Sequence, residues 1–193
     1  MFEVRIHGRG GQGAVTAAEI LSVAAFSEGK HAQAFPTFGS ERSGAPVVSF
    51  CRIDTKAIRI HEPIAEPDGL IVQDPTLLHQ VKVFDGVGPD TYILINTSRS
   101  FADLGIEEIA ANAAGGRLMS VPATEIAREL VGKPLPNAAL LGGFAALAQV
   151  VSLAAVMDAI RKHWVGPVGE ANAQAAAVAH EHVLNERKRF AHA

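Results

Sequence analysis

The pattern of apolar and polar residues predicts several short secondary-structure elements at the start of the chain. Phe2 to His7 alternate around Val4 and Ile6, and after a run of glycines the segment Ala14 to Phe26 carries apolar residues at helical spacing. A shorter apolar and polar segment, His31 to Phe35, is typical of another strand. The chain is therefore predicted to begin with a strand, a glycine turn, a helix and a second strand.

The next segment predicts a hairpin. Val47 to Ile53 and Ala57 to His61 both have strand patterns, and the polar residues Asp54, Thr55 and Lys56 separate them. A hairpin at this place would add antiparallel strands to the sheet.

Short, β-branched apolar runs in the second half are typical of buried parallel strands. They span Leu70 to Val72, Tyr92 to Ile95 and Leu118 to Val121, and the first two are followed by the polar residues Asp74 and Asn96. Helices are expected to alternate with these strands. The segment Pro75 to Gln80 is expected to be the start of one helix, and another is expected to cover Ala123 to Val131 with Thr124 as its cap.

From Pro136 onward the pattern is helical only. We expect three helices, with Asn137 capping the first of them and Gly142 and Gly143 permitting close packing; they span Asn137 to Val151, Leu153 to Trp164, and Gly169 to Phe190. The architecture predicted for residues 1–193 is a single α/β domain with a Rossmann-like, mostly parallel twisted sheet, an antiparallel hairpin excursion, helices on both faces, and a helical C-terminal third (about 137–190).

Composition and charge narrow the class of protein. The net charge of −3 gives no basic footprint for a nucleic-acid backbone. Cys51 is the only cysteine, so the chain can neither close an internal disulfide nor supply the thiolates of an iron–sulfur cluster. No apolar stretch of about 18 residues and no charged leader with an apolar run is present, so we expect no membrane partner and a cytoplasmic protein.

The segment from Gly8 to Gly13 matches the pattern G-x-G-x-x-G between a predicted strand and a predicted helix. Backbone amides at such a helix start can receive an anion, which makes this turn a candidate site for a phosphate or a carboxylate; its residues are Gly8, Gly10, Gly11, Gln12 and Gly13. A dinucleotide would also need an acidic residue about 20 positions later, and His31, Gln33 and Phe35 do not provide one. The alternative interpretation of this segment is a tight turn that binds no ligand.

The loop from Phe35 to Pro46 combines aromatic residues and an arginine with glycine and proline. Aromatic residues on such a loop either fold back onto the core or meet another chain, and aromatics and arginine are enriched at interfaces. The loop is therefore a candidate subunit interface, with Phe35, Pro36, Phe38, Gly39, Glu41, Arg42 and Gly44 as its contact residues.

No catalytic or metal-binding constellation is recognisable from the sequence. His180 and His182 are two apart on a predicted helix and point in different directions, so we expect surface histidines there. Cys51 lies in an apolar strand, as a buried small hydrophobe does. His7, at the end of the first strand, is expected to be a hydrogen-bonded structural residue.

Taken together, these motifs resemble the gamma subunit of the 2-oxoacid:ferredoxin oxidoreductases, a pyruvate synthase-like family. The resemblance covers Gly8 to Leu21 and the loop Phe35 to Pro46, and continues through Asp74-Pro75 and Asn137 to Gly143. It implies a cofactor-free subunit of a complex that decarboxylates a 2-oxoacid oxidatively, transfers the acyl group to coenzyme A and passes two electrons to ferredoxin or another acceptor.

The same resemblance implies that thiamine diphosphate and the iron–sulfur clusters belong to partner subunits, and that this chain helps to enclose coenzyme A. The substrate stays open among pyruvate, 2-oxoglutarate and aryl 2-oxoacids, and so does a homodimer of the isolated chain. Two other functions remain open from the residues alone: a free-standing nucleotide-binding oxidoreductase, and a protein-interaction adaptor without a redox role.

Overall fold

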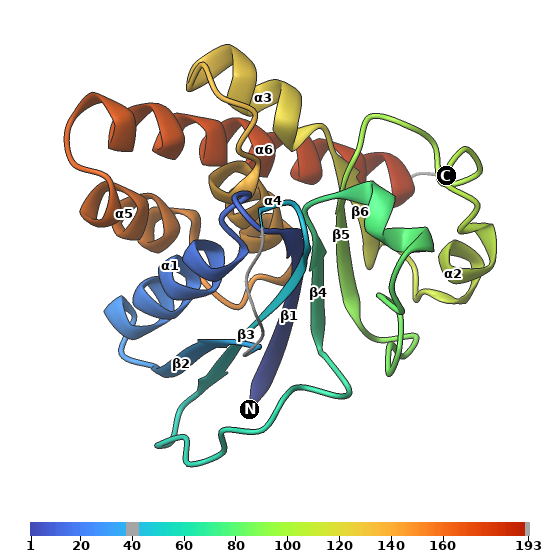
Figure 1. Ribbon diagram of the computed structural model, residues 1–193, viewed down its shortest axis with the longest axis horizontal. Coiled ribbons are helices and arrows are strands. Elements are labelled where there is room, and N and C mark those ends of the chain that lie inside the picture. Colours follow the sequence, from blue (N-terminus) through green and yellow to red (C-terminus); the bar gives the residue numbers. More distant parts are fainter. Residues whose placement is uncertain (38–42, 192–193) are drawn as a thin grey trace.

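The computed structural model describes residues 1–37 and 43–191. Within these residues six strands form one mixed sheet in the order β2-β3-β1-β4-β5-β6 (Figure 1). Neighbours β1, β4, β5 and β6 are parallel, whereas β3 is antiparallel to β1 and to β2. The strands are β1 (Phe2–Arg9), β2 (His31–Pro36), β3 (Pro46–Asp54), β4 (Gly69–Val72), β5 (Tyr92–Asn96) and β6 (Leu118–Val121).

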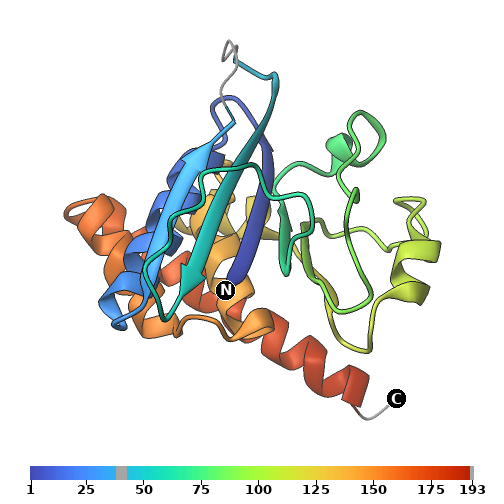
Figure 2. The ribbon, with the colours of Figure 1, turned by 90° about the horizontal axis from the view of Figure 1, so that it is seen from below.

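Most helices gather on one face of the sheet, and α2 lies on the other side (Figure 2). α1 and α4 contact the strands directly, and α6 runs along α4 and α5. The helices are α1 (Ala14–Ser27), the short 3-10 helix η1 (Pro75–His79), α2 (Glu107–Asn112), α3 (Ala123–Leu130), α4 (Asn137–Ala148), α5 (Leu153–His163) and α6 (Pro167–Ala191). The predicted fold class, with its parallel strands, antiparallel addition and helical last third, is confirmed.

Alanine and glycine let the helices on the main face approach one another closely. A Cβ on Gly142 of α4 would lie 1.9 Å from the carbonyl oxygen of Ala176 in α6, and one on Gly143 would lie 3.1 Å from Leu94 of β5. At Gly142 only glycine allows this approach of the two helix backbones, whereas at Gly143 a side chain would press on Leu94. The predicted packing role of these two glycines is confirmed.

The hairpin predicted between residues 47–53 and 57–61 is wrong. Ala57 to His61 form no strand; instead, β3 pairs along its full length with β1 and also with β2. The buried guanidinium of Arg52 donates hydrogen bonds to the carbonyl oxygens of Ile60 (3.4 Å) and Glu62 (2.7 Å). These carbonyls are therefore satisfied by a side chain, and the segment crosses the sheet without joining it.

Two predicted helix caps, Thr124 and Asn137, are also wrong. Thr124 lies inside α3, where its amide donates to the side-chain oxygen of Asn96 (3.1 Å) and its hydroxyl accepts from the Asn96 amide group (2.8 Å). Asn137 is the first residue of α4 and follows Pro136, with no side-chain hydrogen bond that caps the helix. Among the described residues no helix is long and apolar enough to cross a membrane.

Candidate anion-binding site

The turn from Gly8 to Gly13 joins the carboxyl end of β1 to the start of α1. Gly11 and Gly13 have φ values of 93° and 76°, which only glycine adopts readily. The amides of Ala14, Val15 and Thr16 have no acceptor among the described residues, and no side chain caps the helix. The start of α1 therefore presents unpaired amide donors and the positive end of the helix dipole.

An arginine at the end of β1 holds this turn in place. Arg9 forms an ion pair with Asp74, with 3.0 Å between Nε and Oδ2. Its two other nitrogens donate to the carbonyl oxygen of Gly44 (3.0 Å) and to the side chains of Thr76 and Gln80 (2.6 Å each). One side chain thus connects the turn to the segment after β4 and to the loop before β3.

Asp74 is the acceptor on which this arrangement converges. Its Oδ2 also accepts from Gln12 (2.9 Å), and its Oδ1 accepts from the amide (2.9 Å) and hydroxyl (2.6 Å) of Thr76. Burial by itself raises the pKa of Asp74, but the hydrogen bonds from Thr76 and Gln12 and the charge of Arg9 lower it below its usual value. The carboxylate is therefore ionised and its charge is compensated before any ligand binds.

Among the predicted anion-site residues, Gln12 differs from the glycines because its side chain forms hydrogen bonds inside the turn. Its side-chain oxygen accepts from the amide of Arg9 (2.8 Å) and its nitrogen donates to Asp74. The side chain of Gln12 thus stabilises the turn from within, which leaves backbone amides as the groups available to an anion. Arg9 and Asp74 were not predicted as members of the site; a charged residue at the end of each of two adjacent parallel strands was the available signal.

The loop before β3 lies directly against the turn. The amide of Gly10 donates to the carbonyl of Ala45 (2.9 Å), and the amide of Gly44 donates to the carbonyl of Gly10 (3.0 Å). The glycine turn and the loop before β3, which are far apart in the sequence, are therefore hydrogen-bonded to each other. Four of the predicted contact residues lie outside the described residues: Phe38, Gly39, Glu41 and Arg42.

Phe35 folds back onto the sheet of its own chain. Its ring lies 5.1 Å from the ring of Phe50, and the guanidinium of Arg52 lies 5.3 Å above it. Phe35 and Pro36 are each half-buried, whereas Gly44 is exposed. Phe35 thus packs on its own sheet at the base of the loop, and the interface stays a prediction.

Two buried carboxamides lie behind the turn and explain two of its glycines. A Cβ on Gly8 would lie 2.6 Å from Oε1 of Gln73, and a Cβ on Gly13 would lie 2.4 Å from Nδ2 of Asn137. Both side chains are almost completely buried, and the carboxamide of Gln73 has no hydrogen-bond partner among the described residues. The start of α4 is therefore packed against the start of α1 at this point.

His7 and Cys51 are buried and take no part in the turn. His7 is 5% exposed, and burial first, then the charge of Arg5, lowers its pKa to about 4. Neither of its ring nitrogens has a partner in the described part of the chain, so the predicted hydrogen-bonded histidine is wrong in that respect. Cys51 is buried as predicted, and burial raises the pKa of its thiol to about 12.

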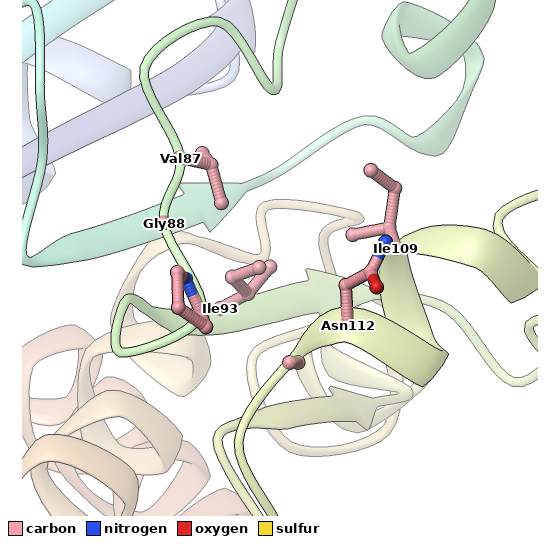
Figure 3. Close-up of a pocket in the computed structure, with 7 residues that line it drawn as sticks. Val87, Gly88, Ile93, Ile109 and Asn112 are labelled. Carbon is pink, nitrogen blue, oxygen red and sulfur yellow. The ribbon is translucent and has the colours of Figure 1, made fainter.

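The opposite end of the sheet contains a small apolar cavity. It has a volume of about 310 Å³ and lies beside Ile93 at the amino end of β5, between α2 and the segment Val87 to Pro89 (Figure 3). Ile109 and Asn112 close it from α2. None of the predicted site residues lines this cavity. In the described ranges no group of three His, Cys, Asp or Glu side chains is placed to hold a metal ion.

Comparison with known proteins identifies relatives over nearly the whole chain. The family model described as pyruvate ferredoxin/flavodoxin oxidoreductase matches residues 3–182. The pyruvate/ketoisovalerate oxidoreductases common subunit gamma of Thermococcus kodakarensis is 49% identical over 176 residues, which cover 91% of this chain and 94% of the relative.

Solved structures agree with this comparison. The pyruvate oxidoreductase subunit PORC of Thermotoga maritima is 34% identical, with a TM-score of 0.80, and covers 93% of this chain and 95% of its own. The 2-oxoglutarate:ferredoxin oxidoreductase of Magnetococcus marinus, solved with 2-oxoglutarate, coenzyme A and succinyl-CoA bound, has the same fold in 31% of its chain, with a TM-score of 0.72 at 15% identity over 96% of this chain. The chain belongs to the gamma subunits of the pyruvate ferredoxin/flavodoxin oxidoreductase family.

Proposed function

We propose that this chain is the gamma subunit of a 2-oxoacid:acceptor oxidoreductase that carries no cofactor itself and binds coenzyme A for its partner subunits. In the reaction, a 2-oxoacid and coenzyme A give an acyl-CoA and CO₂, and two electrons pass to ferredoxin or another acceptor. The single cysteine of the chain is too few for an iron–sulfur cluster. Thiamine diphosphate and the clusters therefore belong to the other subunits in this proposal.

The proposed binding of coenzyme A rests on the unpaired backbone amides at the start of α1. Its unpaired amides and helix dipole attract a phosphate, and the glycines of the turn add no side chains of their own. Asp74 would repel an anion if it were alone, but Arg9 lies 3.0 Å away and compensates its charge. A pyrophosphate at this turn therefore meets donors without meeting a free carboxylate.

The loop from Phe35 to Pro46 is the proposed contact with the thiamine-bearing subunit. Its base is fixed by the hydrogen bonds of Gly44 and Ala45 to the turn. An anion held at the turn would then lie beside the subunit junction, where the acyl group must be transferred. The thiamine-bearing and iron–sulfur subunits are the proposed partners; neither nucleic acid nor a membrane is part of the proposal.

A free-standing dinucleotide-binding enzyme is less consistent with the sheet. In that fold the strand after the first helix lies next to β1 and ends in the acid that holds the ribose. Here β3 separates β2 from β1, and β2 ends in Phe35-Pro36. The turn consequently lacks the neighbouring acid that a nicotinamide dinucleotide requires.

A pair of glycine substitutions tests the coenzyme A site. Gly11 and Gly29 have similar φ values (93° and 78°), and neither would meet an atom within 4 Å on gaining a Cβ. Gly11→Asp and Gly29→Asp therefore impose similar strain and the same charge, but only Gly11→Asp puts a carboxylate at the start of α1. In the assembled complex, Gly11→Asp should raise the KM for coenzyme A about tenfold or more, which corresponds to about 1.4 kcal/mol, and Gly29→Asp should not.

Assembly is tested in parallel by purifying the complex on a tag carried by this chain. Arg42→Ala should weaken the recovery of the partner subunits if the loop is the interface. The proposal fails if Gly11→Asp and Arg42→Ala leave both the KM for coenzyme A and the subunit composition unchanged.

A further inference from the structure

A second cavity lies on the other side of Asn137 from the glycine turn. It has a volume of about 420 Å³ and opens between the connection from α3 to α4 and the start of α6. This size falls within the range of small-molecule sites, which is about 300–1,000 Å³. Trp164, Leu135 and Val168 contribute apolar walls, and Asn137, Asn172 and Lys133 contribute polar groups.

The cavity exists because α6 begins close to the end of α5. A Cβ on Gly169 would lie 1.8 Å from the carbonyl oxygen of Trp164, so only glycine permits this approach. Trp164, which is half-buried, and the exposed Val168 both line the cavity. An indole and aliphatic groups with a few placed polar atoms are typical of a pocket for a flat aromatic ring.

The polar groups can read the edge of a heteroaromatic base. Asn172 is 5% exposed, its Nδ2 donates to the carbonyl of Val168 (2.8 Å), and its Oδ1 accepts nothing from the described residues. This oxygen is an acceptor for an exocyclic amine. Asn137 lines the cavity without offering a polar edge: its Nδ2 faces Gly13, 3.5 Å from the carbonyl oxygen, and its Oδ1 accepts from the amide of Ala138 (3.0 Å). The exposed ammonium of Lys133 provides a positive charge at the rim.

Asn137 belongs to the wall of this cavity and also lies against Gly13. The connection from α3 descends past the start of α1 to reach α4 (Figure 1). The cavity and the start of α1 therefore share Asn137 as a common wall, which places a ring in the cavity near phosphates held at the turn. Coenzyme A has this composition, because its adenine base is joined through a ribose to the pyrophosphate.

We propose that the cavity between Trp164 and Asn137 binds the adenine base of coenzyme A. This inference rests on the proposed coenzyme A site at the glycine turn and adds the place of the base to it. Trp164 and Leu135 enclose the two faces of the ring, the Oδ1 of Asn172 accepts from its exocyclic amine, and Lys133 lies near the phosphate of the ribose.

Trp164 is the only tryptophan of the chain, so its fluorescence reports on the cavity directly. The full chain is titrated separately with adenosine 3′,5′-bisphosphate, which carries the base, and with 4′-phosphopantetheine, which does not. We expect a saturable change in Trp164 emission with the first compound and none with the second. A signal from 4′-phosphopantetheine alone would show that the cavity takes the other end of coenzyme A and would overturn the proposal.

Two leucine substitutions on α6 separate the cavity from the rest of the protein. Ala171 lines the cavity and Ala177 does not, and both are half-buried alanines in the same helix. Ala171→Leu fills the space for the base, whereas Ala177→Leu adds the same side chain elsewhere. In the assembled complex, the KM for coenzyme A should rise about tenfold in Ala171→Leu and stay within about twofold of wild type in Ala177→Leu.

The outcomes distinguish this inference from the glycine-turn site. If Gly11→Asp raises the KM and Ala171→Leu does not, the base lies elsewhere and the inference is wrong, while the turn site stands. If Ala171→Leu raises the KM and Gly11→Asp does not, the cavity binds the base and the phosphates lie away from the turn. If Ala171→Leu releases the partner subunits instead, the cavity is a protein contact and the inference is overturned.

Discussion

Arg9 and Asp74 are 65 positions apart in the chain, yet the guanidinium of Arg9 lies 3.0 Å from the carboxylate of Asp74. Arg9 is the last residue of β1 and Asp74 follows β4, and the carboxyl ends of these adjacent parallel strands meet at one edge of the sheet. Their side chains remain 21% and 15% exposed, so solvent screens the pair only in part. The position of the glycine turn relative to β4 depends on this contact.

Asp74→Ala should destabilise the fold measurably. The substitution removes the acceptor of Arg9 and Gln12 and also the side chain that caps η1, so we expect a loss of about 1–3 kcal/mol in the free energy of unfolding. For a chain of this size the midpoint should fall by roughly 2–4 °C per kcal/mol. Urea and thermal unfolding of the purified chain measure both quantities.

Asp90→Ala is the matched control for this prediction. Asp90 also pairs with an arginine, Arg117, but at 3.6 Å and with 84% of its side chain exposed. Such a pair contributes little, so this variant should stay within about 0.5 kcal/mol of wild type. Equal losses in the two variants would show that Asp74 has no special role in holding the turn.

The pH dependence of stability should report the buried His7. Its pKa is lowered from 6.5 to about 4 in the folded chain, because burial and then the charge of Arg5 disfavour the imidazolium. The unfolded chain therefore binds more protons between these two pH values, and stability falls as the pH falls from about 6.5 to about 4. The shift corresponds to about 3 kcal/mol at the acid end of this range.

His7→Leu should abolish this share of the pH dependence. Leucine does not titrate, and it also removes two ring nitrogens that have no partner among the described residues. Urea unfolding at pH 7 and pH 4.5 should show the variant gaining on wild type toward acid, while the exposed His31→Gln retains the wild-type slope. Parallel slopes for wild type and His7→Leu would contradict the assignment.

The sequence predicted elements well where local pattern decides them. The strand Leu118–Val121 has the predicted bounds, and α1 differs from its prediction by one residue, because a continuous apolar run or a helical period identifies each. The prediction failed at Ala57 to His61, whose strand-like alternation found no partner strand. It also omitted α2, which has only six residues and no buried face of its own.

The candidate site was predicted only in its backbone. Glycines between a strand and a helix identify the turn locally, and the structure places Asn96 at the end of buried β5 and Asp74 just after buried β4. Which side chains meet there depends on the register of β1 against β4. Local sequence pattern does not reveal this register. Asn137 was taken for a local cap because its contact with Gly13 joins residues 124 positions apart, which local pattern does not reveal.

The contact of Gly13 with Asn137 can be measured by a double-mutant cycle. Gly13→Ala introduces a Cβ at a φ of 76° and places it 2.4 Å from Nδ2 of Asn137. The backbone term should cost about 1–2 kcal/mol and the overpacking about 1–3 kcal/mol more. In the background Asn137→Ala only the backbone term should remain, giving an interaction energy of about 1–3 kcal/mol. Gly29→Ala, with a φ of 78° and open space around it, isolates the backbone term independently. If Gly13→Ala costs no more than Gly29→Ala, the turn can move away from α4, and the wall shared with the cavity beside Trp164 is not rigid.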